Sequence, residues 1–489
     1  MAATLVVAGV VGLLACGLAV PLAWVAAQAL AARTRSLALA ALALPLLQPG
    51  YLWYAGVSAA RGPGTWLGGI IERGPQWVNI GIGQSLAVVG VAVSIMPIAG
   101  VLLVAGFGTL PRSTLETLRL EPCGPLVRWW LMVRLTWRSL AGAAALGALV
   151  ALGSAVPLHL AQVDTYAIGL WRMMDLAGPS TSAAVVWAAT PLVLVAVVAA
   201  WVLSGRLLNA GDAGGDVDAS PAGVGANALA AAWVVGLGAT VLPAGLLAAS
   251  LRESALLAQF WRDSGAAVAQ SLFVASAVGA VCGLTTAGVW LLLSSVPVRG
   301  STRGARRGVL ARGVLTLGLA CALLPGVLVG WLIRLGATKI GAWWLGVDDF
   351  VSGTSAGLVL GHSARFAGLA MVIGVLLARA EPRGLKELRA SEGAAGFAAW
   401  WRLCLLPGWK PLAGAGLAAM SLSMFEIEAS VMLQAPGTGS LARTLLEHLH
   451  TLRDQQLAAG AVNLMAIGLV LAAVSGWLVG PLVARGAEW

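Results

Sequence analysis

Nine stretches of this 489-residue chain contain no Asp, Glu, Lys or Arg, and each is long enough to cross a bilayer as a helix, which takes about 20 apolar residues. They are residues 1–32, 36–60, 74–111, 139–163, 176–205, 219–251, 264–298, 313–333 and 455–484. Two further apolar segments carry charges: 351–378 contains Arg365, and 411–435 contains Glu426 and Glu428. The sequence therefore predicts an all-α, polytopic membrane protein with about eleven transmembrane helices.

The composition supports a protein whose surface faces lipid. Only 10% of the residues are charged, against about 25% in soluble domains, so the chain cannot cover its own surface in water. The 63 glycines fit a membrane bundle, because small residues let helices approach closely. The net charge of +10 does not indicate nucleic-acid binding, because the basic residues flank the predicted spans and no nucleic-acid-binding module stands apart from them.

The distribution of Arg and Lys predicts an orientation. If the N-terminus lies outside, the cytoplasmic segments contain 20 of the 30 basic residues and the outside segments contain nine. Membrane proteins concentrate Arg and Lys on the cytoplasmic side. With an odd number of spans, the N-terminus is then outside and the C-terminus is cytoplasmic. The first apolar stretch lacks a basic leading segment and is too long for a signal peptide, so we expect it to be the first span.

The chain is predicted to consist of two repeated halves, residues 1–205 and 227–489, joined by a flexible Gly-, Ala- and Asp-rich cytoplasmic linker at 206–226. A single offset aligns Glu116 with Glu387, Trp129-Trp130 with Trp400-Trp401, and Leu135 with Leu406. Upstream, LPLLQPGYL (44–52) resembles LLPGVLVGWL (323–332). The first half has five predicted spans and the second has six. The additional helix, at 219–251, lets two five-helix units run in the same direction.

The aligned segments, 112–138 and 381–407, resemble the EAA loop of binding-protein-dependent ABC permeases. In that family a Glu and two alanines are followed by a Gly and, about a dozen residues later, by Leu-Pro. The second segment matches this pattern at Glu387, Gly393, Leu406 and Pro407. The first matches only at Glu116 and Leu135, with Pro122 and Thr136 in place of the Gly and the Pro. The resemblance implies that both segments couple the chain to an ATPase, as a helix docks in a partner's groove.

The resemblance implies a transport subunit rather than an enzyme: the inner-membrane permease of a type I ABC importer. The chain lacks a G-x-x-x-x-G-K-[ST] motif and is expected to bind no cofactor, so ATP and Mg²⁺ belong on two copies of a separate ATPase. A periplasmic substrate-binding protein would deliver the solute for alternating access. The alternative is an ion-coupled secondary transporter, which broken helices with mid-membrane polar residues in both halves would favour.

Two short motifs bear on the solute. Residues 425–450 resemble a segment of ferric-iron permeases, with Glu426 on that family's Glu. HSARF (362–366) resembles a short Arg-Phe stretch of the same family, with Arg365 on its Arg. This resemblance implies ferric iron or an iron chelate as the solute. Thiamine permeases share the fused two-half layout, so thiamine is the alternative.

Ionisable residues within a span are costly to bury and point to function. Arg365 and Glu426 lie on consecutive predicted spans, where they either pair across two helices or line the solute's passage. Glu426 and Glu428 are about 200° apart on a continuous helix, so at most one of them is expected to face a central route. No two cysteines are spaced like metal ligands, and no metal site is expected.

Overall fold

The computed structural model describes residues 2–62, 65–120, 124–154, 156–175, 182–209, 223–294, 302–344, 346–381, 384, 398, 401–406, 408–451 and 453–484. All regular elements in these ranges are helices, and eight of them are long and apolar enough to cross a membrane. Two helix pairs also qualify as single spans with a bend at a break: Ala32–Leu46 with Gly50–Arg61, by 85°, and Gly308–Leu323 with Gly326–Gly341, by 117°. The protein is therefore an all-α, membrane-spanning chain, as the sequence predicts.

The tenth predicted span in chain order, 411–435, is interrupted. Helix α20 (Trp409–Met424) ends at Met424, and the short helix α21 (Glu428–Leu433) begins four residues later. Each of the eleven predicted segments nevertheless coincides with a helix or a broken helix in the described residues. The structure therefore differs from the sequence prediction mainly in continuity, because several segments that look uniformly apolar contain breaks.

The chain forms two compact units, of which unit 1 comprises Met1–Gly169, Gly215–Ala258 and His448–Met465. Its elements are α1 (Ala2–Gln28), α2 (Ala32–Ala43), η1 (Leu44–Leu47), α3 (Gly50–Ser58), η2 (Ala59–Arg61), α4 (Trp66–Arg73), α5 (Gln76–Gly108), α6 (Arg112–Leu120), α7 (Pro125–Gly153), α8 (Val156–Leu160), α11 (Ala226–Gly236), η3 (Leu237–Val241) and α12 (Leu242–Ser250). It also takes the first parts of α9 (Tyr166–Asp175) and α23 (Asp454–Ala484). The additional helix predicted at 219–251 is thus α11, η3 and α12, and it packs in unit 1.

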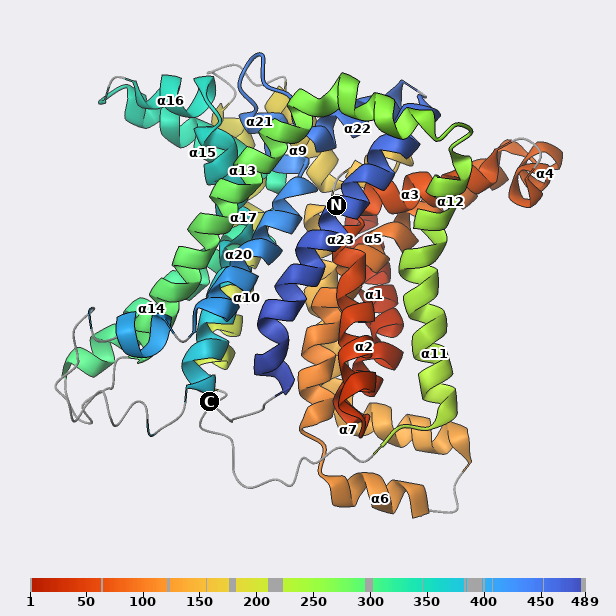
Figure 1. The fold of residues 1–489 in the computed structure, drawn as a ribbon, viewed down its shortest axis with the longest axis vertical. Helices are drawn as coiled ribbons and strands as arrows, with labels where there is room; N and C mark the ends of the chain where they lie inside the picture. The colour runs from red at the N-terminus through yellow and green to blue at the C-terminus, as the bar shows by residue number, and fades with distance from the viewer. Residues whose placement is uncertain are drawn as a thin grey trace. The chain divides into compact units, whose positions relative to one another are not determined.

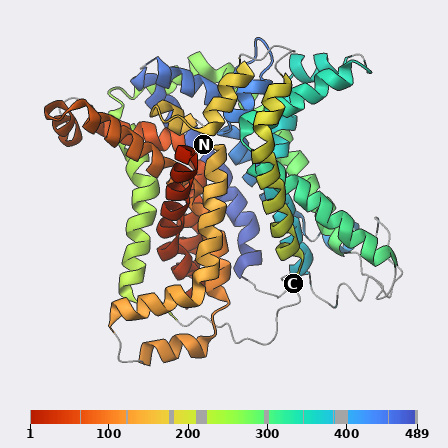
Figure 2. The ribbon, with the colours of Figure 1, turned by 180° about the vertical axis from the view of Figure 1, so that it is seen from behind.

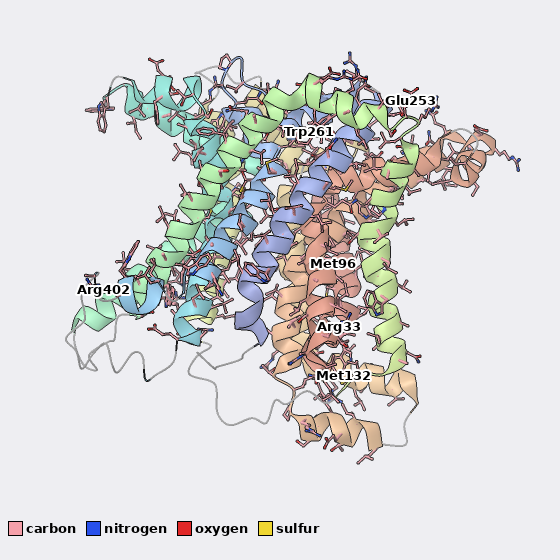
Figure 3. All side chains as sticks on the ribbon, in the orientation of Figure 1. Arg33, Met96, Met132, Glu253, Trp261 and Arg402 are labelled. Carbon is pink, nitrogen blue, oxygen red and sulfur yellow. The ribbon has the colours of Figure 1, made fainter. Side chains whose placement is uncertain are left out.

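The core of unit 1 lies between α1, α5 and α7, which pack against one another (Figure 1). Met96 of α5, labelled in Figure 3, is fully buried in this core. Glycine brings α1 and α7 together: a Cβ on Gly12 would lie 2.3 Å from the carbonyl oxygen of Ala144. The additional helix packs against α1 and α3, although it opens the second half of the sequence.

Unit 2 comprises Leu170–Gly214, Gln259–Glu447 and Ala466–Trp489. Its elements are α10 (Ser182–Asn209), α13 (Ala255–Ser294), α14 (Thr302–Leu323), α15 (Gly326–Gly341), α16 (Val347–Gly353), α17 (Ala356–Ala380), η4 (Trp401–Leu405), α20, α21 and α22 (Leu441–His450), with the remaining parts of α9 and α23. Helix α14 packs against α10 and α17, and α15 packs against α16, α17 and α21. Helix α10, yellow in Figure 2, exposes Trp187 and Val198, as expected of a helix that faces lipid.

The order of elements repeats between the two sequence halves. A long helix (α1, α13) is followed by a broken pair (α2–α3, α14–α15), a short helix (α4, α16) and a long helix (α5, α17). The aligned Glu is followed in each half by a further helix (α7, α20), two short helices (α8 and α9, α21 and α22) and a closing helix (α10, α23). The resemblance between 44–52 and 323–332 falls on the breaks: Pro49 and Pro325 directly precede α3 and α15. Proline suits this position because its missing N–H is not needed at a helix start.

Close packing at Gly12 predicts a position-specific cost. We expect Gly12→Leu to destabilise the folded protein by about 1–3 kcal/mol, because the new side chain would have to displace α7. On the same helix, a Cβ added to Gly9 would have no neighbouring atom within 4 Å, so Gly9→Leu is the matched control and should leave stability near that of the parent. Thermal unfolding of both variants in detergent tests this. Equal stability of the two variants would contradict the packing described for α1 and α7.

Candidate functional site

Unit 2 contains two helix breaks that leave backbone groups without partners in their own helices. The first lies between α14 and α15, at Leu324 and Pro325, and the second lies between α20 and α21, at residues 425–427. The last carbonyl groups of a helix and its first N–H groups have no intrahelical partner. In an apolar membrane interior no water replaces those partners, so other protein groups must supply them.

Arg365 supplies the donors for the first break. It lies about 14 Å along α17 from the start of that helix, near the middle depth of a membrane span. Its Nη1 donates to the carbonyl oxygen of Leu324 and, at 3.5 Å, to that of Ala322. Arg365 thus satisfies carbonyl groups at the end of α14.

Two carboxylates supply the acceptors. Glu428 accepts the N–H of Gly326, the first residue of α15, at 3.1 Å, and Glu426 accepts the N–H of Ala429 in α21, also at 3.1 Å. Nε of Arg365 lies 3.7 Å from Oε2 of Glu426, and its Nη2 lies 3.5 Å from Oε2 of Glu428. The three side chains are 17%, 10% and 12% exposed, in the order Arg365, Glu426 and Glu428, so water screens their interaction little.

Both glutamates reach one arginine because the helix is broken between them. The expectation that Glu426 and Glu428 face different sides assumed a continuous helix over 411–435, and it is wrong. Glu426 lies in the connection after Met424, and Glu428 is the first residue of α21. The break removes the 200° separation. Residues 425–427 contain no proline or glycine, so the local sequence does not indicate this break, whereas Pro325-Gly326 does mark the break between α14 and α15.

Glycine is required where these elements meet. A Cβ on Gly326 would lie 2.7 Å from Oε1 of Glu426 and 2.7 Å from Cβ of Glu428. The start of α15 therefore touches both carboxylate side chains directly. The positive end of the α15 dipole faces the same carboxylates and adds to the attraction of Arg365.

His362, one turn before Arg365 on α17, is a buried polar residue with two hydroxyl partners. Its Nδ1 lies 2.8 Å from Oγ of Ser423, and its Nε2 lies 2.9 Å from Oγ of Ser430. These contacts join α17 to both segments of the broken α20–α21 pair. Among the described residues, no group of three or more His, Cys, Asp or Glu side chains is arranged to bind a metal ion.

The first half has uncharged residues at the matching places. The offset that aligns Glu116 with Glu387 also places Ser94 on Arg365 and Pro157 on Glu428. Gly50, the first residue of α3, takes the place of Gly326. A Cβ on Gly50 would lie 3.0 Å from Cγ of Pro157 and 3.4 Å from Oγ of Ser94. Both halves thus bring a post-proline glycine against the short helix α8 or α21, but only the second half does so with charged side chains.

The first EAA-like segment forms α6 and the start of α7, at one end of unit 1 (Figures 1 and 2). A groove of about 510 Å³ lies between the two helices and is lined by Thr114, Thr117, Leu118, Leu131, Arg134 and Leu135. Leu135 is 49% exposed and Trp130 is 56% exposed, although both are apolar. Glu116 pairs with Arg112 at 2.7 Å on the surface, a contact worth only a few tenths of a kcal/mol.

The second EAA-like segment lies largely outside the described residues, including Glu387, Gly393 and Pro407. Leu406, the residue aligned with Leu135, is exposed. The segment starts at Glu381, which is 5% exposed and follows α17 directly.

Buried hydrogen bonds lie where the two EAA-like segments begin. Gln28, the last residue of α1, donates from Nε2 to the carbonyl oxygen of Phe107 near the end of α5, at 2.8 Å. Ser294, the last residue of α13, donates to the carboxylate of Glu381 at 2.6 Å. In each half, therefore, the end of the first long helix is bonded to the chain close to the start of the EAA-like segment: five residues before it at Phe107, and at its first residue, Glu381. Isolated Gln and Ser residues carry no motif, so these contacts could not be predicted from the sequence.

No family model, curated protein or solved structure matches this chain.

The two-carboxylate geometry predicts which variants recover stability. We expect Arg365→Met to reduce folded protein in the membrane strongly, because breaking a buried ion pair costs about 3–5 kcal/mol. Adding only Glu426→Ala should recover little, since Glu428 is still stranded. The triple variant Arg365→Met, Glu426→Gln, Glu428→Gln should recover much more, because glutamine oxygens still accept the N–H groups of Gly326 and Ala429.

Membrane abundance and thermal unfolding of these variants test this expectation, with the exposed Arg334→Met as the control. Normal abundance and stability in Arg365→Met would show that the cluster does not stabilise the fold. Loss of uptake alone would then assign Arg365 to the solute's passage.

Proposed function

We propose that this chain is the membrane-spanning permease of a type I ATP-binding-cassette importer. The observation that carries the proposal is the groove between α6 and α7, which lies at one end of unit 1 and is formed by a segment that recurs at 381–407. Exposed apolar side chains beside a groove suit a soluble protein partner. The partner we propose is an ABC ATPase, one copy for each EAA-like segment.

In this proposal the chain is a transport subunit, and ATP hydrolysis with Mg²⁺ takes place on the two ATPase copies. A periplasmic substrate-binding protein delivers the solute from the other side. ATP-driven movement of the EAA-like segments is passed to the long helices close to where each segment begins, because Gln28 and Ser294 make buried hydrogen bonds there. The solute then crosses by alternating access.

We propose ferric iron or an iron chelate as the solute, with thiamine as the alternative. Support for iron comes from the resemblance of 362–366 and 425–450 to ferric-iron permeases. Arg365 and Glu426, the two residues matched to charged positions of that family, meet in one cluster together with Glu428. The contacts of this cluster favour a stabilising role for it, so uptake and stability need to be measured together.

The inner membrane is the proposed location, with the N-terminus outside and the C-terminus cytoplasmic. The internal geometry of each unit supports the predicted alternation of sides. In unit 1, Arg33 and Met132 lie toward one end and Glu253 lies at the other; in unit 2, Arg402 and Trp261 lie at opposite ends (Figure 3). Arg33, Met132 and Arg402 belong to segments predicted to be cytoplasmic, and Glu253 and Trp261 lie in or beside one predicted to be outside.

Reporter fusions test the orientation. We expect fusions after Leu207 and after Trp489 to report a cytoplasmic location and a fusion after Gly62 to report an external one. The physical reason is the excess of Arg and Lys in the segments predicted to be cytoplasmic. An external result at Leu207 would overturn the number and order of spans in the first half.

Charge reversal tests the coupling role of the EAA-like segments. We expect Glu387→Lys to reduce ATP-dependent uptake by about tenfold or more, because a reversed charge at an interface costs about 2–5 kcal/mol. Glu116→Lys should have a smaller effect, since the first segment matches the family pattern at fewer positions. Glu253→Lys, on an exposed residue of the other end, is the control. Normal uptake and ATPase stimulation in both EAA-like variants would refute the coupling role.

An ion-coupled secondary transporter is the second candidate, and one observation favours it. Both halves contain broken helices, α2–α3 and α14–α15, and such breaks are typical of solute sites in secondary transporters. The charged residues at the break occur in the second half only. Uptake that continues without an ATPase but stops when the proton gradient is collapsed would select this candidate.

A further inference from the structure

The additional helix contains a distortion that removes its own hydrogen bonds. Residues Leu237–Val241 form a π-turn, and Pro243 follows at the start of α12. In a regular helix the N–H of residue 243 would bond to the carbonyl group of Ala239, but proline has no N–H. The Ala239 carbonyl group, in a residue that is only 5% exposed, therefore needs a donor from elsewhere.

That donor comes from the broken helix of the first half. Nε1 of Trp53, in α3, donates to the carbonyl oxygen of Ala239 at 3.1 Å, and the contact is buried. Trp53 is itself 5% exposed, so its indole N–H would be costly to leave unpaired.

A second side chain is inserted into the same distorted turn. Gln48 lies in the break between η1 and α3 and is 2% exposed. With its amide oriented so that both ends are satisfied, its nitrogen donates to the carbonyl oxygen of Thr240 at 3.3 Å and its oxygen accepts the N–H of Ala244 at 3.3 Å. Residues 240 and 244 are the partners that a regular helix would bond to each other. The Gln48 amide therefore replaces one bond of the additional helix with two bonds to the break.

The two elements are also in close contact beyond these bonds. A Cβ on Gly56 of α3 would lie 2.5 Å from the carbonyl oxygen of Pro243, and one on Gly236 would lie 3.2 Å from Cβ of Ala41 in α2. No larger residue fits at Gly56 unless α3 moves away from α12. The additional helix thus contacts both segments of the broken pair, on either side of the break.

We propose that the additional helix is a fixed brace for the break between α2 and α3, with Gln48 and Trp53 as the positioning residues that fix α3 against its π-turn. Both halves thus fix a break with buried side-chain contacts, in opposite senses. Arg365 and Glu428 bind backbone groups of the α14–α15 break, whereas Gln48 and Trp53 extend from the α2–α3 break to backbone groups of the additional helix. The first half holds its break with neutral hydrogen bonds to the additional helix, and the second half holds its break with an ion cluster. The proposal does not depend on which transport class is correct.

Hydrogen exchange of the full chain in lipid nanodiscs tests the brace. We expect Trp53→Phe and Gln48→Leu each to speed exchange in residues 44–58 by about fivefold, and the double variant by about thirtyfold. Each variant has a net loss of one hydrogen bond, about one kcal/mol, because residues 240 and 244 can bond to each other once Gln48 is removed. Exchange in residues 323–341 should not change. Glu428→Leu, which removes the acceptor of the Gly326 N–H, should show the reverse pattern, with faster exchange in 323–341 only.

Three further variants separate the hydrogen bonds from general packing. Thr240→Val removes a buried hydroxyl that has no partner among the described residues, so it should leave exchange unchanged, as should Trp233→Phe on the exposed face of the same helix. Pro243→Ala restores an N–H four residues after Ala239, so in that background Trp53→Phe should speed exchange by less than about twofold.

Unchanged exchange at 44–58 in the Trp53 and Gln48 variants would overturn the proposal. So would an equal increase in both regions, or a Trp53→Phe effect that Pro243→Ala does not reduce. None of these outcomes bears on whether an ATPase drives uptake, so the brace and the proposed function can fail separately.

Discussion

Every interruption of a membrane helix leaves N–H and C=O groups that lipid cannot satisfy, and this constraint accounts for the most important buried polar contacts of the protein. At the α14–α15 break, Arg365 donates to carbonyl groups at the end of one helix, and Glu428 accepts an N–H at the start of the next. At the π-turn of the additional helix, Trp53 donates to the Ala239 carbonyl group. In each place the side chain satisfies the backbone group that the local sequence leaves without a partner.

The two halves meet this constraint with different chemistry at matching places. Gly50 and Gly326 both follow a proline and both pack against a short helix, α8 in one half and α21 in the other. At the α2–α3 break, whose neighbouring side chains are uncharged, the stabilising contacts are made to the additional helix, which has no counterpart in the repeat. At the α14–α15 break, three ionisable side chains lie in an apolar region, where burying the charge of each is favourable only while its partners are present. The half whose break packs against the additional helix thus has, among the described residues, no buried charges at that break, and the other half has three.

In the proposed permease, the breaks and the EAA-like segments have separate tasks. The breaks shape the interior of each unit, whereas the groove between α6 and α7 presents apolar side chains to a partner. Buried hydrogen bonds of Gln28 and Ser294 connect the start of each EAA-like segment to the end of a long helix. A displacement of either segment would thus act on helices of the core rather than on a loose connection.

The sequence alone determined the all-α membrane class, the position of each apolar segment and the repeat marked by Glu116 and Glu387, because hydropathy and spacing are local properties. It did not determine that Glu426 and Glu428 share Arg365, since the angle between them depends on a helix break that no periodicity shows. Nor did it identify Trp53, whose partner lies 186 residues away in the chain. Only tertiary packing decides which unpaired backbone group lies beside which donor, because each contact requires two helices to approach closely at one place.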